Sequence, residues 1–136
     1  MEIMQVVEIL HKDYERNRVE GCLDRAIILF CAMKNNGLNP KIEHFYYKQV
    51  DGKEYTHHFV VLENEVYDCN EEVTPTYVLE YKKRKERSHP ELRWGNSNTL
   101  IRDNYLVSDL LFYSERFDEA FRNYLEENSR WLLAEM

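Results

Sequence analysis

The sequence predicts an α+β fold in which a buried helix packs on an antiparallel β-meander, with additional helices toward the C-terminus. Two observations carry this prediction. The first third of the chain has apolar residues at helical spacing, whereas residues 41–69 are rich in aromatic and β-branched residues and are broken by tight-turn dipeptides. With 136 residues, the chain is expected to form one domain that spans residues 1–136.

Two helices are expected before the first strand. Residues 2–18 form an amphipathic pattern, because Ile3, Val6, Val7, Leu10 and Tyr14 recur at helical spacing. A second helix is predicted from Cys22 to Asn36. Its segment Ala26–Met33 is apolar nearly all round, so we expect it to be buried on most sides. Gly37 predicts the end of this helix, since glycine readily adopts the left-handed conformation found there.

The middle of the chain predicts three consecutive antiparallel strands. Residues 41–50 form the first, Asp51-Gly52 is a strong hairpin signal, and Glu54 to Leu62 return as the second. A tight turn at Glu63-Asn64 leads to a short third strand from Glu65 to Cys69.

The remaining sequence has weaker patterns. Residues 76–87 are compatible with a helix, and Ser88 to Asn98 predict a loop because proline, glycine and polar residues interrupt them. Leu100 to Phe112 have a mixed pattern. Apolar residues at helical spacing then predict a C-terminal helix over residues 115–135.

Composition and charge exclude several classes of protein. The chain is 43% hydrophobic and 13% aromatic, which is typical of a folded protein. Its net charge of −7 disfavours general binding to nucleic acids, because an acidic protein repels phosphate. One basic run, Lys82 to Arg87, is expected to be a solvated helix face, with contact to an acidic partner as the alternative.

The cysteines and the apolar runs bear on the compartment. An odd number of cysteines (Cys22, Cys31 and Cys69) fits a reducing compartment better than a disulfide framework. The N-terminal residues lack the features of a signal peptide, and the run Ala26–Met33 is too short to cross a membrane. We therefore expect a cytoplasmic protein without membrane association.

Cys22 is the candidate nucleophile. It follows Gly21 and falls in the first turn of the second expected helix. Unpaired backbone N–H groups and the positive end of the helix dipole favour a thiolate there, and they can stabilise an oxyanion. A buried structural cysteine is the alternative interpretation of the same residue.

A cysteine nucleophile needs a base, and the base needs an orienting carboxylate. His57 and His58 lie on the second expected strand, and Asp68 lies on the third, so the hairpin can bring them together. Because side chains alternate along a strand, at most one of the two histidines can point at the helix that carries Cys22.

The segment Glu20-Gly21-Cys22-Leu23-Asp24-Arg25-Ala26 resembles the nucleophile motif of transglutaminase-like (papain-like) enzymes, Gly-x-Cys-x-Asp-x-Ala, with the glycine one place nearer the cysteine. That family continues with a hydrophobic helix, a glycine-bearing turn, a strand, a His-x-aromatic-Val strand and a Tyr-Asp element. The matching segments here are Ala26–Met33, Gly37, residues 41–50, His57-His58-Phe59-Val60 and Val66-Tyr67-Asp68.

The resemblance covers residues 20–70 and implies a transglutaminase-like domain with Cys22, His57 and Asp68 as catalytic residues. The family motif places the aromatic residue two positions after the catalytic histidine, and Phe59 has this relation to His57 rather than to His58. The family usually carries an oxyanion-hole side chain before the nucleophile, which makes Tyr14 and Asn17 candidates by position alone.

A zinc site is the alternative for the same region, since cysteine, histidine and aspartate are all zinc ligands. No Cys-x-x-Cys or His-x-x-x-His spacing supports it, so no metal is expected. The sequence also has no phosphate-binding glycine loop and no nucleophile elbow, and no cofactor is expected. Cys31 and Cys69 are expected to be packed side chains.

Two hypotheses for function follow. The first is cysteine-dependent acyl transfer on an amide or ester of a protein or peptide, to water or to an amine, through Cys22, His57 and Asp68. Hydrolysis is preferred, because no feature of an acceptor site is visible. The second is a non-catalytic interaction module, an inhibitor or adaptor, on the same scaffold.

Overall fold

The computed structural model describes residues 2–18, 21–97 and 115–128. Within these ranges the chain forms four helices and a five-stranded antiparallel sheet, which confirms the α+β class. None of the helices in this part of the chain has the length and apolar character needed to cross a bilayer.

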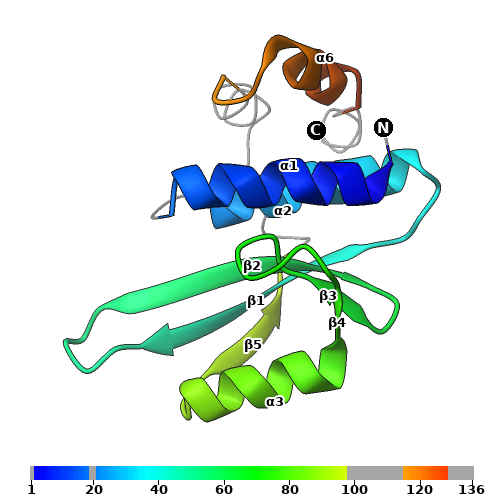
Figure 1. The fold of residues 1–136 in the computed structure, drawn as a ribbon. Helices are drawn as coiled ribbons and strands as arrows, with labels where there is room; N and C mark the ends of the chain where they lie inside the picture. The colour runs from blue at the N-terminus through cyan, green and yellow to red at the C-terminus, as the bar shows by residue number, and fades with distance from the viewer. Residues whose placement is uncertain (1, 19–20, 98–114, 129–136) are drawn as a thin grey trace.

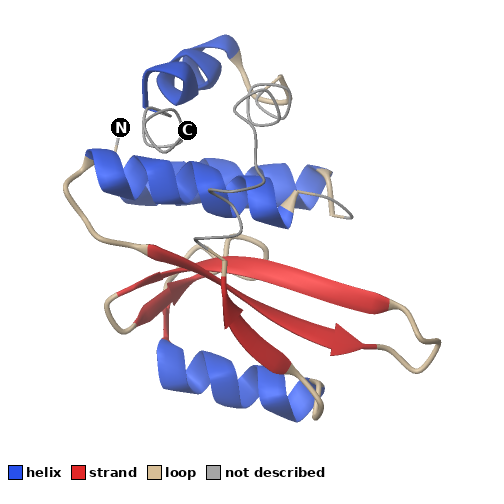
Figure 2. Cartoon of the chain, turned by 180° about the vertical axis from the view of Figure 1, so that it is seen from behind, coloured by secondary structure: helices blue, strands red, loops and turns tan. Residues whose placement is uncertain are grey.

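The helices lie in layers around the sheet (Figures 1 and 2). Helices α1 (Ile3–Arg16) and α2 (Cys22–Asn35) lie side by side over one face, and α3 (Val78–Ser88) covers the other face. Helix α6 (Glu119–Asn128) lies beyond α1 and α2 and contacts α2. The rest of the expected C-terminal helix, residues 129–135, and the segment 100–112 lie outside the described residues.

The sheet has the strand order β4-β3-β2-β1-β5, with every neighbouring pair antiparallel. The strands are β1 (Lys41–Lys48), β2 (Glu54–Leu62), β3 (Glu65–Tyr67), β4 (Thr76–Tyr77) and β5 (Arg93–Asn96). The first three form the expected meander, and strand alternation divides their side chains between two cores.

Each face of the sheet has its own core. On one face, Ile42 and Val60 pack against the apolar sides of α1 and α2, together with Phe121 and Leu125 of α6. On the other face, the core consists of Phe45, Phe59, Val61, Val66 and Tyr81 of α3. The expected burial of the second helix is confirmed, because most of its residues between Ala26 and Met33 are buried.

Both expected turns of the meander are present. Gly52 has φ +86° in the turn between β1 and β2, a conformation that glycine adopts without strain. Glu63 has φ 55° in the two-residue turn where Leu62 pairs with Glu65. Strand β3 ends at Tyr67 rather than at Cys69, so Asp68 follows the strand instead of lying within it.

The expectation of a loop over Ser88–Asn98 was wrong in part, because β5 lies within this segment and pairs with β1. Gly95 lies opposite His44, and a Cβ atom at Gly95 would come 2.6 Å from His44 Nε2. Gly95 therefore leaves room for the His44 ring on the neighbouring strand, and it does not interrupt the strand.

Candidate active site

Helix α2 begins at Cys22, directly after Gly21, which adopts the left-handed conformation with φ +98°. No side chain caps this helix end. The Gly21 carbonyl accepts the N–H of Arg25, and the earlier N–H groups of the first turn point out of the helix. Cys22 therefore lies at the positive end of α2, partly exposed to solvent.

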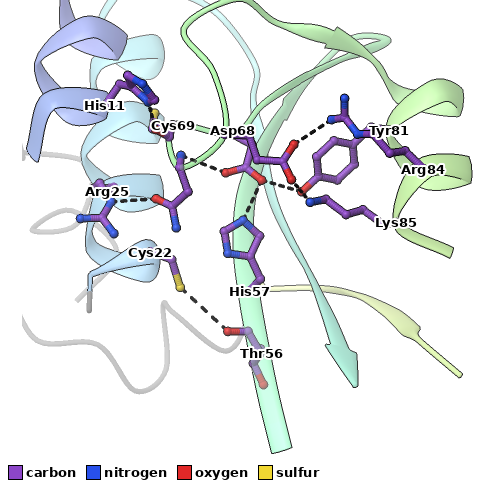
Figure 3. A network of polar contacts seen from close by, with 12 residues as sticks. His11, Cys22, Arg25, Thr56, His57, Asp68, Cys69, Tyr81, Arg84 and Lys85 are labelled. Atoms are coloured by element: carbon purple, nitrogen blue, oxygen red, sulfur yellow. Dashed lines mark hydrogen bonds and ion pairs between the residues drawn. The ribbon is translucent and has the colours of Figure 1, made fainter. Parts of the chain in front are cut away.

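The Cys22 sulfur lies beside an open edge of β2. Strand β3 pairs only with residues 60–62 of β2, and no described strand pairs with Thr56–His58 on that side. Cys22 Sγ lies there, 3.9 Å from the carbonyl oxygen of Thr56, and it also accepts a hydrogen bond from the His58 N–H. Figure 3 shows the thiol directed from α2 toward β2 at this place.

His57 and Asp68 are paired, with 2.7 Å between His57 Nε2 and Asp68 Oδ2. The register explains the contact. Tyr67 lies opposite Val60, so the next residue, Asp68, falls beside Phe59 and diagonal to His57 on the same face of the sheet. The side chain of Asp68 is 4% exposed and that of His57 is 18% exposed, so the pair is largely shielded from water.

Asp68 has further donors beyond His57. The Tyr81 hydroxyl donates to Oδ2 over 2.7 Å, and the Asn70 backbone N–H donates to Oδ1 over 3.1 Å. Burial alone would raise the pKa of Asp68, but His57, Tyr81 and the charge of Lys85 outweigh it, and the pKa is lowered. Asp68 is therefore held as a buried carboxylate.

This carboxylate controls the neighbouring histidine. Burial would lower the pKa of His57, but the charge and hydrogen bond of Asp68, followed by those of Cys22, raise it to about 9. Burial likewise would raise the pKa of Cys22, but the hydrogen bond and charge of His57 lower it below its ordinary value. Each shift favours an imidazolium paired with a thiolate.

His58 lies on the opposite face and takes no part in this pair. Its Nδ1 and that of His44 lie 3.1 Å and 2.5 Å from Ser97 Oγ, respectively. Burial, together with the charges of His44 and His57, lowers the pKa of His58 to about 4. Of the two histidines, the structure thus brings His57 to both Cys22 and Asp68.

Cys22 and His57 do not meet across a face of the sheet, as strand alternation predicts for a histidine and a packed helix. His57 shares its face of the sheet with α3, whereas α2 packs mainly on the other face. Cys22 reaches His57 at the open edge of β2, beside which the first turn of α2 lies (Figure 3). An argument from strand faces alone would have favoured His58.

Arg25 is a site residue that the sequence did not reveal. Its Nε donates to Asn70 Oδ1 over 3.0 Å, and its Nη1 donates to Asp13 Oδ2 of α1 over 2.9 Å. Arg25 is 2% exposed, so these are buried, charge-assisted hydrogen bonds. They tie α2 and Cys22 to the turn that carries Asp68.

The basic run of α3 is only in part a solvated face. Lys83, Arg84 and Arg87 are exposed, in agreement with the expectation. Lys82 is partly buried and Lys85 more so, because the Lys85 side chain is 16% exposed and pairs with Glu71. Its ammonium also lies 5.7 Å from the centre of the Phe45 ring. The spacing of charges along the chain contains no signal that distinguishes Lys85 from its neighbours.

A cleft of about 330 Å³ opens over the site. Cys22 and His57 line it, along with Tyr14 of α1, Lys85 of α3 and His89. Of the two oxyanion-hole candidates, Tyr14 therefore borders the cleft. Asn17 instead donates its amide to Asp13 Oδ1 over 3.0 Å.

The other two cysteines are packed side chains, as expected. Cys31 belongs to the core between α1, α2 and α6. Cys69 is 6% exposed, and burial raises the pKa of its thiol to about 12, so it stays protonated. Among the described residues, no three His, Cys, Asp or Glu side chains are arranged to hold a metal ion.

Comparison of the chain with models of protein families, with curated proteins and with solved structures found no match. The case for any activity therefore depends on the geometry of the site itself.

Proposed function

We propose that this protein is a cysteine-dependent acyltransferase or hydrolase that acts on an amide or ester bond, as its resemblance to transglutaminase-like enzymes implies. One observation carries the proposal: a buried Asp68–His57 pair adjoins a partly exposed thiol at a helix start. The charges of this chain stabilise the thiolate, which is the nucleophilic form of cysteine.

Acylation starts from the ion pair. The Cys22 thiolate attacks the carbonyl carbon, a C–S bond forms, and the carbonyl π electrons move to oxygen. In this proposal, the positive end of α2 stabilises that oxyanion. The His57 imidazolium then gives its proton to the leaving nitrogen or oxygen, the bond to the leaving group breaks, and a thioester remains.

Deacylation reverses these roles. Neutral His57 takes a proton from water or an amine as it attacks the thioester, and the Cys22 thiolate leaves with the electrons of the C–S bond. Asp68 stabilises the imidazolium that forms in each half-reaction. Water is the preferred acceptor in this proposal, because the cleft is open and its exposed lining is mostly polar.

The non-catalytic alternative makes different demands on the site. A buried Cys22, or two histidines directed away from it, would favour an inhibitor or adaptor. Cys22 is instead partly exposed, and its thiol and the His57 ring shift each other's pKa. This mutual shift supports the enzyme over the interaction module.

Alkylation of Cys22 by iodoacetamide as a function of pH tests the proposal. We expect the wild-type rate to reach half its maximum below pH 9.0, the ordinary value for the thiol, because the Cys22 pKa is lowered. In His57→Ala the hydrogen bond and the charge are lost, so the profile moves up toward that of an ordinary thiol.

His58→Ala is the matched control, since it removes a neighbouring imidazole that faces the other side of the sheet. Its labelling profile should stay close to that of the wild type. An ordinary thiol profile in the wild type, unchanged by His57→Ala, would sink the proposed catalytic pair.

A further inference from the structure

A second cleft, of about 660 Å³, lies next to the candidate active site. The tip of the β1–β2 hairpin lines one side, from Tyr47 to Asp51, and the segment from Ser88 to Glu91 lines the other. Tyr47 and His89 also line the cleft that holds Cys22 and His57, so the two clefts adjoin there.

Stacked aromatic rings connect the two clefts. The rings of Tyr47 and His89 are stacked with 3.9 Å between their centres, and Tyr47 also stacks on Tyr55 at 5.6 Å. Phe45 continues the series, 5.2 Å from the ring of His57. A rigid aromatic surface of this kind favours apolar and aromatic ligand groups over strongly hydrated ones.

The two clefts differ in character. The exposed lining of the active-site cleft is mostly polar, whereas that of the second cleft is mostly apolar. Val50 is fully exposed at the hairpin tip, and Pro90 lies in the facing segment. A cleft with a mostly apolar lining is typical of a ligand-binding site.

The length of the combined groove indicates the kind of ligand. A strand advances about 3.3 Å per residue, so the four-residue step from Phe45, beside His57, to Gln49 in the second cleft spans about 13 Å. A small acyl group cannot cover this span. An extended polypeptide covers it with four residues, and it supplies the amide bonds on which a cysteine nucleophile acts.

We propose that the second cleft is a substrate subsite that binds a large apolar or aromatic side chain of an extended polypeptide, about four residues from the bond at Cys22. This inference deepens the proposed function and rests on it for the position of the reacting bond. Binding of the side chain itself depends only on the second cleft, so it can be tested without catalysis.

The test uses Cys22→Ala protein and two fluorescein-labelled decapeptides of alanine and serine, which differ by one phenylalanine or one aspartate at the same position. Fluorescence anisotropy measures the dissociation constants. We expect the phenylalanine peptide to bind about tenfold more tightly, in line with burial of one aromatic side chain.

Two matched variants locate the site. Val50→Glu places a charge in the second cleft and should abolish the preference for phenylalanine. Leu79→Glu makes the same change at a residue of α3 that is 55% exposed and lines neither cleft, and should leave the preference intact. Equal affinities of the two peptides, or a preference that survives Val50→Glu, would overturn the inference.

An experiment on the wild-type protein then distinguishes the proposed subsite from the proposed catalysis. Mass spectrometry of the phenylalanine peptide after incubation should place the reacted bond about four residues from the phenylalanine. If the phenylalanine preference depends on Val50 while Cys22 is alkylated as an ordinary thiol, binding of a polypeptide side chain in the second cleft is supported and the proposed catalysis is contradicted. If Cys22 is activated but no preference exists, the subsite is wrong and the catalytic proposal stands.

Discussion

His57 and His58 are neighbours in the chain with opposite environments. His57 faces a buried carboxylate, which raises its pKa to about 9, whereas burial beside another imidazole lowers the pKa of His58 to about 4. Strand alternation sends the two rings to opposite faces of the sheet, where their neighbours differ. His57 is therefore the histidine that carries charge at neutral pH, because it shares a face of the sheet with Asp68.

Replacing Asp68 with asparagine tests this dependence. The substitution keeps the shape of the side chain and removes its charge, so the pKa of His57 should fall from about 9 toward its ordinary value. Cys22 then loses its cationic partner, and we expect its alkylation rate near pH 6 to fall about tenfold or more, measured with iodoacetamide.

Tyr81→Phe is the graded control for this substitution. It removes one hydrogen bond to Asp68 Oδ2 and keeps the charge. We expect a smaller change in alkylation rate than in Asp68→Asn. A rate in Asp68→Asn equal to that of the wild type would contradict the role assigned to the carboxylate.

Arg25 connects three segments of the fold. It extends from α2 to Asp13 of α1 on one side and to Asn70, in the turn after β3, on the other. Asn70 in turn donates its backbone N–H to Asp68. The distance between Cys22 and Asp68 is thus set by a buried polar connection as well as by apolar packing.

The two halves of this connection should differ in their effect on stability. Arg25→Met removes the α2 partner of the buried Asp13 carboxylate, which keeps its ion pair with Arg116, and we expect a loss of about 2 kcal/mol in the free energy of unfolding. Asn70→Ala removes one hydrogen bond and should cost about 1 kcal/mol. Urea denaturation measures both changes.

The alkylation rate of Cys22 distinguishes a role of Asn70 in positioning the site from a role in stability alone. Asn70→Ala should slow alkylation of Cys22 at pH values where the protein is fully folded, because the turn that holds Asp68 loses its tie to α2. An alkylation profile identical to that of the wild type would limit Arg25 and Asn70 to a structural role.

The sequence predicted the elements that depend on local signals. Asp51-Gly52 and Glu63-Asn64 mark turns through their own conformational preferences, and the resulting register brings His57 to Asp68. Strand β5 escaped prediction, because its pairing partner lies about 50 residues earlier and Gly95 resembles a loop residue.

Partners that lie far apart in the sequence also kept part of the candidate site from being predicted. Tyr81 lies 13 positions from Asp68, and Arg25 lies 45 positions from Asn70, with no repeating pattern to connect them. Their roles follow from side chains that meet across elements, and single-sequence patterns carry no information on such contacts.

The candidate site lies where the three layers of the molecule meet, at the open edge of β2. Helix α2 supplies Cys22 from one face of the sheet, and α3 supplies Tyr81 and Lys85 from the other (Figure 3). The sheet and the following turn supply His57 and Asp68. Folding of all three layers is therefore coupled to the ionisation of the site.

The pH dependence of folding stability should reflect this coupling. The folded pKa of His58, about 4, lies below its ordinary value of 6.5, so the unfolded chain binds more protons and stability is lost as pH falls from 6.5 toward 4. The folded pKa of His57, about 9, lies above 6.5, so its contribution is fully present below pH 6.5 and is lost as pH rises toward 9.

We therefore expect the free energy of unfolding, measured in urea between pH 4 and 9, to be highest near pH 6.5. Cys22→Ser is the background for the measurement, because ionisation of the thiol would add an opposite slope above neutral pH. His58→Gln should reduce the slope on the acid side, where His44 still contributes, and His57→Gln should remove the slope on the alkaline side. Slopes that both variants leave unchanged would mean that other groups couple the fold to pH, and that the pKa values of the two adjacent histidines do not differ in this way.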